Sequence, residues 1–208
     1  MSSRQGQLFL ALTAIVVAFF MVWLPHEAAG LSFIGLEMGE EAKFLPQVQS
    51  GEILPGRSLF YLPPVTAGLM LALLSGRWSN GRWQTWAARA FAVALSWLAF
   101  PALEALGTER AEWLWRILMI GLVFLAAALA PLLQRRERLL WTLLGVAALA
   151  GALLPTWVYL AVRPAFSALL QEQVGIGPGV WLNLAGQLLA LRVAVWQLLR
   201  PVASVPSP

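Results

Sequence analysis

Residues 113–141 read WLWRILMIGLVFLAAALAPLLQRRERLLW, a long apolar run that ends in a cluster of arginines before a second apolar run begins. A helix rises about 1.5 Å per residue, so about 20 apolar residues cross the roughly 30 Å hydrocarbon core of a bilayer. Segment 113–133 is long enough to do so. The arginines behind it mark the place where the chain returns to water. We interpret this stretch as two membrane-spanning helices joined by a tight basic turn.

Further apolar segments lie on both sides of this hairpin. The expected spans are residues 8–24, 60–76, 84–106, 113–133, 139–162 and 178–199. The chain is 60% hydrophobic and 12% charged, whereas a soluble domain carries about 25% charged residues. We therefore predict an all-α integral membrane protein, a six-transmembrane-helix bundle that forms a single polytopic domain over residues 1–208.

The charged residues alternate in sign between successive connections. Arg4, Arg77, Arg82, the cluster 135–138 and Arg200 fall on one side of the predicted membrane. The other side receives nearly all of the glutamates, in residues 27–52, 104–112 and 172. Lys and Arg favour the cytoplasmic side of a membrane. We expect an N-in, C-in topology in a prokaryotic plasma membrane. Segment 8–24 is longer than the roughly 7–15 residues of a signal-peptide core, so it is expected to be a retained first helix.

Two segments on the acidic side are expected to be structured. The loop 25–59 contains the apolar stretch 31–38 and a helix-like stretch 39–45 that ends before Pro46. Residues 31–45 are compatible with an interfacial or a re-entrant segment, and the sequence leaves both open. Residues 165–174 have helical spacing of apolar side chains, which predicts a short interfacial helix before the last span.

The first candidate site is the group Glu37, Glu40 and Glu41 in the loop after the first span, with His26 and Glu27 upstream. Glu37 and Glu41 are four residues apart, so a helix would place both carboxylates on one face. Paired carboxylates can bind a divalent cation or share a proton. No metal-binding motif surrounds them, and a solvated acidic surface is the competing interpretation. They are weak candidates for a metal site, and no cofactor is expected.

The second candidate site is a polar seam on the last span. Asn183 and Gln187 lie on one helical face with Ala190, Ala194 and Gln197. Amides in a bilayer seek partners on other helices, so this seam either packs against neighbouring helices or lines a substrate path. Arg192 is predicted to point away from the seam, and Arg116 to pair with Glu112 four residues before it.

Several chemistries are disfavoured by what the sequence lacks. It has no cysteine and one histidine, and it shows no G-x-S-x-G elbow and no P-loop. Its basic residues are spread over the helix ends, which argues against a nucleic-acid partner. The leading hypothesis is a non-catalytic subunit or scaffold of a membrane complex, with the lipid bilayer and other membrane subunits as partners. The alternatives are a small permease that uses the polar seam, and an outer-face ion-binding protein or enzyme that uses the glutamates.

Overall fold

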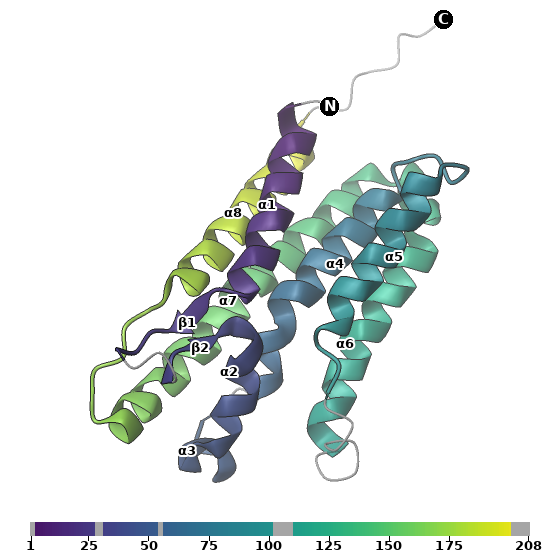
Figure 1. The fold of residues 1–208 in the computed structure, drawn as a ribbon. Coiled ribbons are helices and arrows are strands. Elements are labelled where there is room, and N and C mark those ends of the chain that lie inside the picture. Colours follow the sequence, from purple (N-terminus) through teal and green to yellow (C-terminus); the bar gives the residue numbers. More distant parts are fainter. Residues whose placement is uncertain (1–2, 28–30, 54–55, 102–109, 201–208) are drawn as a thin grey trace, which may run out of the picture.

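The computed structural model describes residues 3–27, 31–53, 56–101 and 110–200. Within these ranges the bundle is formed by the helices α1 (Ser3–Phe19), α4 (Leu62–Ser75), α5 (Trp83–Trp97), α6 (Arg110–Leu129), α7 (Glu137–Leu170) and α8 (Pro178–Leu198) (Figure 1). The connection between α1 and α4 contains β1 (Val22–Leu24), β2 (Phe33–Ile34), α2 (Gly35–Glu41), η2 (Ala42–Phe44), α3 (Pro46–Gln49) and η3 (Arg57–Tyr61). The 3-10 helix η5 (Ala130–Arg135) follows α6. The predicted helical class is confirmed.

Helices that can cross a membrane are present in the described part of the chain. The stretches that qualify by length and composition are Arg57–Ser75, Trp113–Leu133, Glu137–Leu170 and Pro178–Leu198. Helix α1 is apolar but has 17 residues, and α5 has 15, so neither qualifies by length. On α6, Leu118, Leu122 and Leu125 are about half exposed. Exposing such surface to water costs about 25 cal/mol per Å², so lipid is the solvent that fits it.

Helix α4 is the central element of the bundle. The apolar stretch Arg57–Ser75 is 89% buried, whereas Trp113–Leu133 on α6 is 28% buried. Helix α4 contacts α1, α5, α6 and α7, and Figure 1 shows it lying between these helices. Gly68 allows one of these contacts to be close, because a Cβ there would collide with the carbonyl oxygen of Ala92 on α5. The hydrophobic core therefore surrounds α4, and α6 lies at the perimeter.

The first and last helices of the bundle pack along each other. Figure 1 shows α1 and α8 side by side at one edge of the bundle, and α8 also packs on α7. The contact continues beyond α1, where the N–H of Gly177 donates to the carbonyl oxygen of Trp23 at 2.8 Å. Gly179 leaves room for the buried indole of Trp23, which a Cβ at this position would strike. The strand β1 thus joins the end of α1 to the start of α8.

Three predicted span boundaries differ from the helices. The predicted segment 8–24 is helical only to Phe19, because the chain turns there and Val22–Leu24 pairs as β1 with β2. Segment 60–76 begins in η3, and α4 proper starts at Leu62. Segment 84–106 is helical only to Trp97, and the residue before Pro101 is sterically biased away from helical geometry. Residues 102–106 of that segment lie outside the described residues.

Helix α7 is longer than predicted and replaces the expected short interfacial helix. The segments 139–162 and 165–174 were expected to be separate, but α7 continues without interruption through Pro155 and Pro164 to Leu170. An interior proline removes one backbone hydrogen bond and bends a helix more readily than it ends one when neighbours support it. The helix ends at Gln171, whose φ of 53° places it in the left-handed region. Residues 165–170 are therefore the last turns of α7.

The segment after β2 packs on the bundle as a small cap. Met38 and Ala42 are fully buried in a second apolar cluster with Trp23 of β1, Phe60 of η3 and Tyr159 of α7. The helix α2 begins at Gly35, four residues before the helix-like stretch expected from the sequence. Its apolar residues are thus used to attach it to the bundle. This attachment brings the neighbouring Glu40 to the end of the membrane-compatible helices.

Candidate functional site

Glu40 is the centre of a cluster of charged and polar side chains from the four elements α2, η2, η3 and α6. Its Oε1 accepts hydrogen bonds at 2.9 Å from Nη1 of Arg116 on α6 and at 2.9 Å from Oη of Tyr61 on η3. Its Oε2 lies 3.4 Å from Nη1 of Arg57 and 3.5 Å from Nζ of Lys43. The Arg116 guanidinium carbon also lies 4.0 Å from the ring centroid of Tyr61. We call these residues the Glu40 cluster.

The electrostatics of this cluster favour an ionised Glu40. Burial alone would raise its pKa, but hydrogen bonds from Arg116 and Tyr61, together with the charges of Arg116 and Arg57, lower the pKa to about 2. Arg57 and Arg116 are themselves buried, with side chains 5% and 4% exposed. A buried guanidinium is costly without a counter-ion. Glu40 is therefore the shared counter-ion of two buried guanidinium groups at the junction of α2, η3 and α6.

The two glutamates predicted as metal candidates do not join this cluster. Glu37 is exposed, and its Oε2 accepts the backbone N–H of Ile34 at 3.0 Å, which caps the start of α2. Glu41 is partly exposed. Among the described residues, no three His, Cys, Asp or Glu side chains gather in a way that could hold a metal ion. The metal role of Glu37 and Glu41 stays a prediction.

Sequence reasoning found Glu40 as part of an acidic group but missed its partners. Arg116 was expected to pair with Glu112, whose side chain lies outside the described residues; its recorded partner is Glu40, 76 positions away. A usable signal was present in the sequence. Arg57 and Arg116 are basic residues on the acidic side, each beside an apolar run, and such residues need a counter-ion when they are buried.

Asn183 and Gln187 are completely buried between α8 and its neighbours. The Nδ2 of Asn183 donates to the carbonyl oxygen of Gly151 on α7 at 3.1 Å, and the Nε2 of Gln187 donates to Oγ1 of Thr66 on α4 at 2.8 Å. Thr66 in turn donates to the carbonyl oxygen of Leu62 at 2.9 Å. These contacts join α8, α7 and α4 through the middle of the bundle.

Each of these two amides also carries an oxygen without a hydrogen-bond partner. Asn183 Oδ1 and Gln187 Oε1 are buried acceptors that receive no donor from the described residues. Gly151 fits against the Gln187 amide so closely that a Cβ on it would collide with both Gln187 and Thr66. The seam is therefore tightly packed at Gly151 and contains two buried acceptors without a donor among the described residues.

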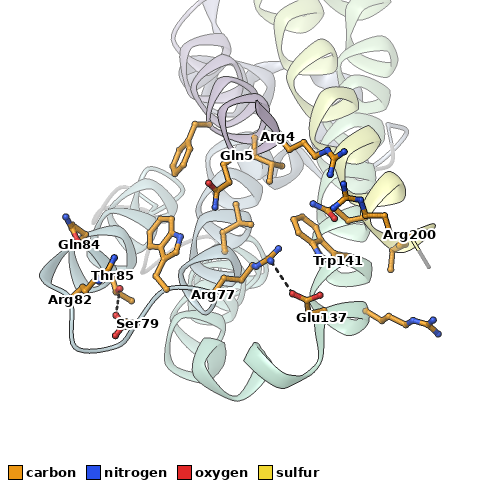
Figure 2. Close-up of a pocket in the computed structure, with 17 residues that line it drawn as sticks. Arg4, Gln5, Arg77, Ser79, Arg82, Gln84, Thr85, Glu137, Trp141 and Arg200 are labelled. Atoms are coloured by element: carbon orange, nitrogen blue, oxygen red, sulfur yellow. Dashed lines mark hydrogen bonds and ion pairs between the residues drawn. The ribbon is translucent and has the colours of Figure 1, made fainter. Parts of the chain in front are cut away.

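A cleft of about 1070 Å³, drawn in Figure 2, lies at the end of the bundle where α1 starts and α8 ends. Helix α2, which carries Glu40, lies toward the other end (Figure 1). It is bordered by the start of α1, the end of α8, the start of α7 and the α4–α5 connection. Its charged lining residues are Arg4, Arg77, Arg82, Arg138, Arg200 and Glu137. Figure 2 shows Arg77 in the middle of the opening with its side chain directed toward Glu137. We call this the basic cleft.

The fold and these sites describe a helical protein with several apolar helices compatible with a membrane. Comparison of the chain with protein family models, with curated proteins and with solved structures finds no match. Function is therefore inferred from the chemistry of the described residues.

Proposed function

We propose that the chain is a six-span plasma-membrane protein with both termini in the cytoplasm, and that it acts as a non-catalytic subunit or scaffold. The observation that carries this proposal is how the buried polar side chains are used. Glu40 holds α2, η3 and α6 together, and the Gln187 amide holds α8 against α4. Polar groups that tie elements together are suited to a rigid frame.

The six-span count is supported by how the two short helices pack. Helix α1 has 17 residues and would span about 26 Å, close to the roughly 30 Å core. It lies along α8, which is long enough to cross. Helix α5 lies along the buried α4 and continues beyond Trp97 in turns through Phe100. Local thinning of the bilayer accommodates helices of this length at modest cost.

The orientation is supported by the distribution of charge. Arg4, Arg77 and Arg200 border the same cleft although they are far apart in sequence. Glu40 and its partners lie at the other end of the bundle. Basic residues favour the cytoplasmic side, so the basic cleft is assigned to that side and the Glu40 cluster to the outside.

A permease that uses the seam on α8 is the second candidate. The observation in its favour is the pair of buried oxygens on Asn183 and Gln187 that receive no donor. The outer-face ion-binding alternative has weaker support, because the Glu40 carboxylate is already surrounded by cationic side chains.

The test is a mass measurement on protein extracted from its own membrane with a lipid-retaining polymer. The scaffold proposal expects a complex of fixed stoichiometry that contains this 22.7 kDa chain and at least one different chain. A particle that contains this chain alone, together with solute uptake into proteoliposomes, would replace the scaffold by the permease. Loss of that uptake in Asn183→Leu would then assign the path to the seam.

A further inference from the structure

The basic cleft has an excess of positive charge that the proposed scaffold role does not explain. Five arginines border it, and Glu137 is the one acidic residue among the described residues that line it. The Nη2 of Arg77 lies 3.1 Å from Oε1 of Glu137, so this pair is neutralised. Within the described ranges, the remaining cleft arginines, Arg4, Arg82, Arg138 and Arg200, have no carboxylate within ion-pair distance.

Two of these arginines are held close together by one indole ring. The guanidinium carbons of Arg4 and Arg200 lie 3.1 Å and 3.9 Å from the ring centroid of Trp196. They are thus at most about 7 Å apart, a distance at which like charges repel. Stacking uses the flat face of a guanidinium and leaves its N–H edges available to an acceptor. An anion bound at these edges would attract both guanidinium groups and so offset the repulsion between Arg4 and Arg200.

Part of the cleft lining is apolar. Leu8 and Phe9 of α1 and Leu74 of α4 border the same cleft as Arg4 and Arg77. A ligand that fits both parts has a compact anionic group and an adjoining apolar or neutral portion. Phosphate groups suit the arginines best, because their oxygens match the guanidinium fork with two parallel hydrogen bonds.

We propose that the basic cleft binds a phosphate-bearing anion, whether or not the chain is a subunit of a larger complex. The phosphate can belong to the headgroup of an anionic phospholipid or to a soluble phosphate compound. Arg4 and Arg200 are the primary ligands, Arg82 and Arg138 add charge at the edge, and Arg77 stays paired with Glu137. Basic pockets between helices on the cytoplasmic side of a membrane have the chemistry to bind such headgroups.

The test uses the full chain in nanodiscs that contain equal amounts of phosphatidylglycerol and phosphatidylcholine. Lipids retained by the protein are counted by native mass spectrometry after release. The wild type is expected to retain phosphatidylglycerol in preference to phosphatidylcholine, and R4Q/R200Q to lose about tenfold of that preference. The matched control is R192Q, which removes an exposed arginine of α8 that does not border the cleft, and it is expected to behave as the wild type.

A second arm titrates inorganic pyrophosphate onto the protein in nanodiscs of phosphatidylcholine alone and follows binding by calorimetry. Binding of pyrophosphate assigns the site to a soluble phosphate compound. Retention of phosphatidylglycerol without binding of pyrophosphate assigns the site to a lipid headgroup. Absence of both in the wild type overturns the proposal, as does an equal loss in R192Q and R4Q/R200Q. If R4Q/R200Q does not fold, R82Q decides in the same assay, with an expected loss of about threefold to fivefold.

Discussion

Arg116 of α6 donates from Nη1 to Oε1 of Glu40 at 2.9 Å. This contact attaches the segment between β2 and α4 to α6, which comes later in the chain, after α4 and α5. The guanidinium also lies over the ring of Tyr61, so a single side chain contacts both α2 and η3. Removing the negative charge of Glu40 would leave the buried guanidinium groups of Arg57 and Arg116 without the carboxylate that they share.

Glu40→Gln is expected to destabilise the fold by about 1–3 kcal/mol. A broken buried ion pair costs about 3–5 kcal/mol, and partial exposure of Glu40 reduces that figure. The measurement is the thermal unfolding midpoint in detergent. The control is Glu37→Gln/Glu41→Gln, which removes two charges from the same helix and is expected to cost less than about 0.5 kcal/mol, because glutamine can still cap α2. Equal loss in both variants would refute the central role of Glu40.

The stability of the protein is expected to fall in acid through Glu40. Its pKa is about 2 in the folded chain, against an ordinary value of 4.5. A lowered pKa means that its contribution is complete above pH 4.5 and is lost as the pH falls toward 2. Unfolding midpoints measured between pH 6 and pH 2.5 are expected to decline in the wild type. Glu40→Gln removes the titrating group, so its decline is expected to be shallower; identical curves would contradict this assignment.

Gly151→Ala is expected to destabilise the bundle by about 1–3 kcal/mol. The new Cβ would collide with the Gln187 amide and with Thr66 Oγ1, which are held by interhelical hydrogen bonds. Gly145→Ala is the matched control on the same helix, because its Cβ would lie at an ordinary 3.6 Å from Ala194. Unfolding midpoints of the two variants give the comparison. A loss of stability in Gly145→Ala as large as in Gly151→Ala would argue against a tight contact at Gln187.

The orientation of the chain can be tested with single cysteines, since the natural sequence has none. Cysteines at Arg82 and Arg136 are expected to be protected from an impermeant thiol reagent in intact cells, and a cysteine at Glu52 to react. All three positions are exposed, so protection would report the membrane and not burial. A cysteine at Glu109, outside the described residues, is expected to react as Glu52 does. The opposite labelling pattern would reverse the topology.

The arrangement of helices follows largely from local patterns that the sequence displays. The apolar run 113–133 and Pro178 near the start of the last helix predict α6 and α8 closely. Charge alternation also anticipates that Arg4 and Arg200 share one end of the molecule. Such features depend on the local pattern of apolar, charged and proline residues and on how that pattern meets the solvent. A single sequence displays this pattern directly.

Other features depend on contacts between distant residues. Val22–Leu24 is apolar enough to continue α1, and only its pairing with β2 makes it a strand. The separate helix expected at residues 165–174 was wrong, because α7 continues through Pro164 to Leu170 and its residues Ala165 and Phe166 pack into the second apolar cluster. The Glu40–Arg116 contact likewise joins residues 76 positions apart, which no periodicity reveals. The burial of Arg116, whose guanidinium needs a counter-ion, is what favours this pair.

The packing of α1 against α8 has a consequence for biosynthesis. Helix α8 is synthesised after α1, α4, α5, α6 and α7, so in the proposed topology α1 has to remain in the membrane without its main partner until those helices have been made. Gly186 of α8, which has no room for a Cβ beside Ile15, completes that contact only after the other helices of the bundle have been synthesised. A nascent chain that stalls before Pro178 would leave the face of α1 that packs on α8 open to lipid or to a helix of another protein. Membrane quality control could recognise this face.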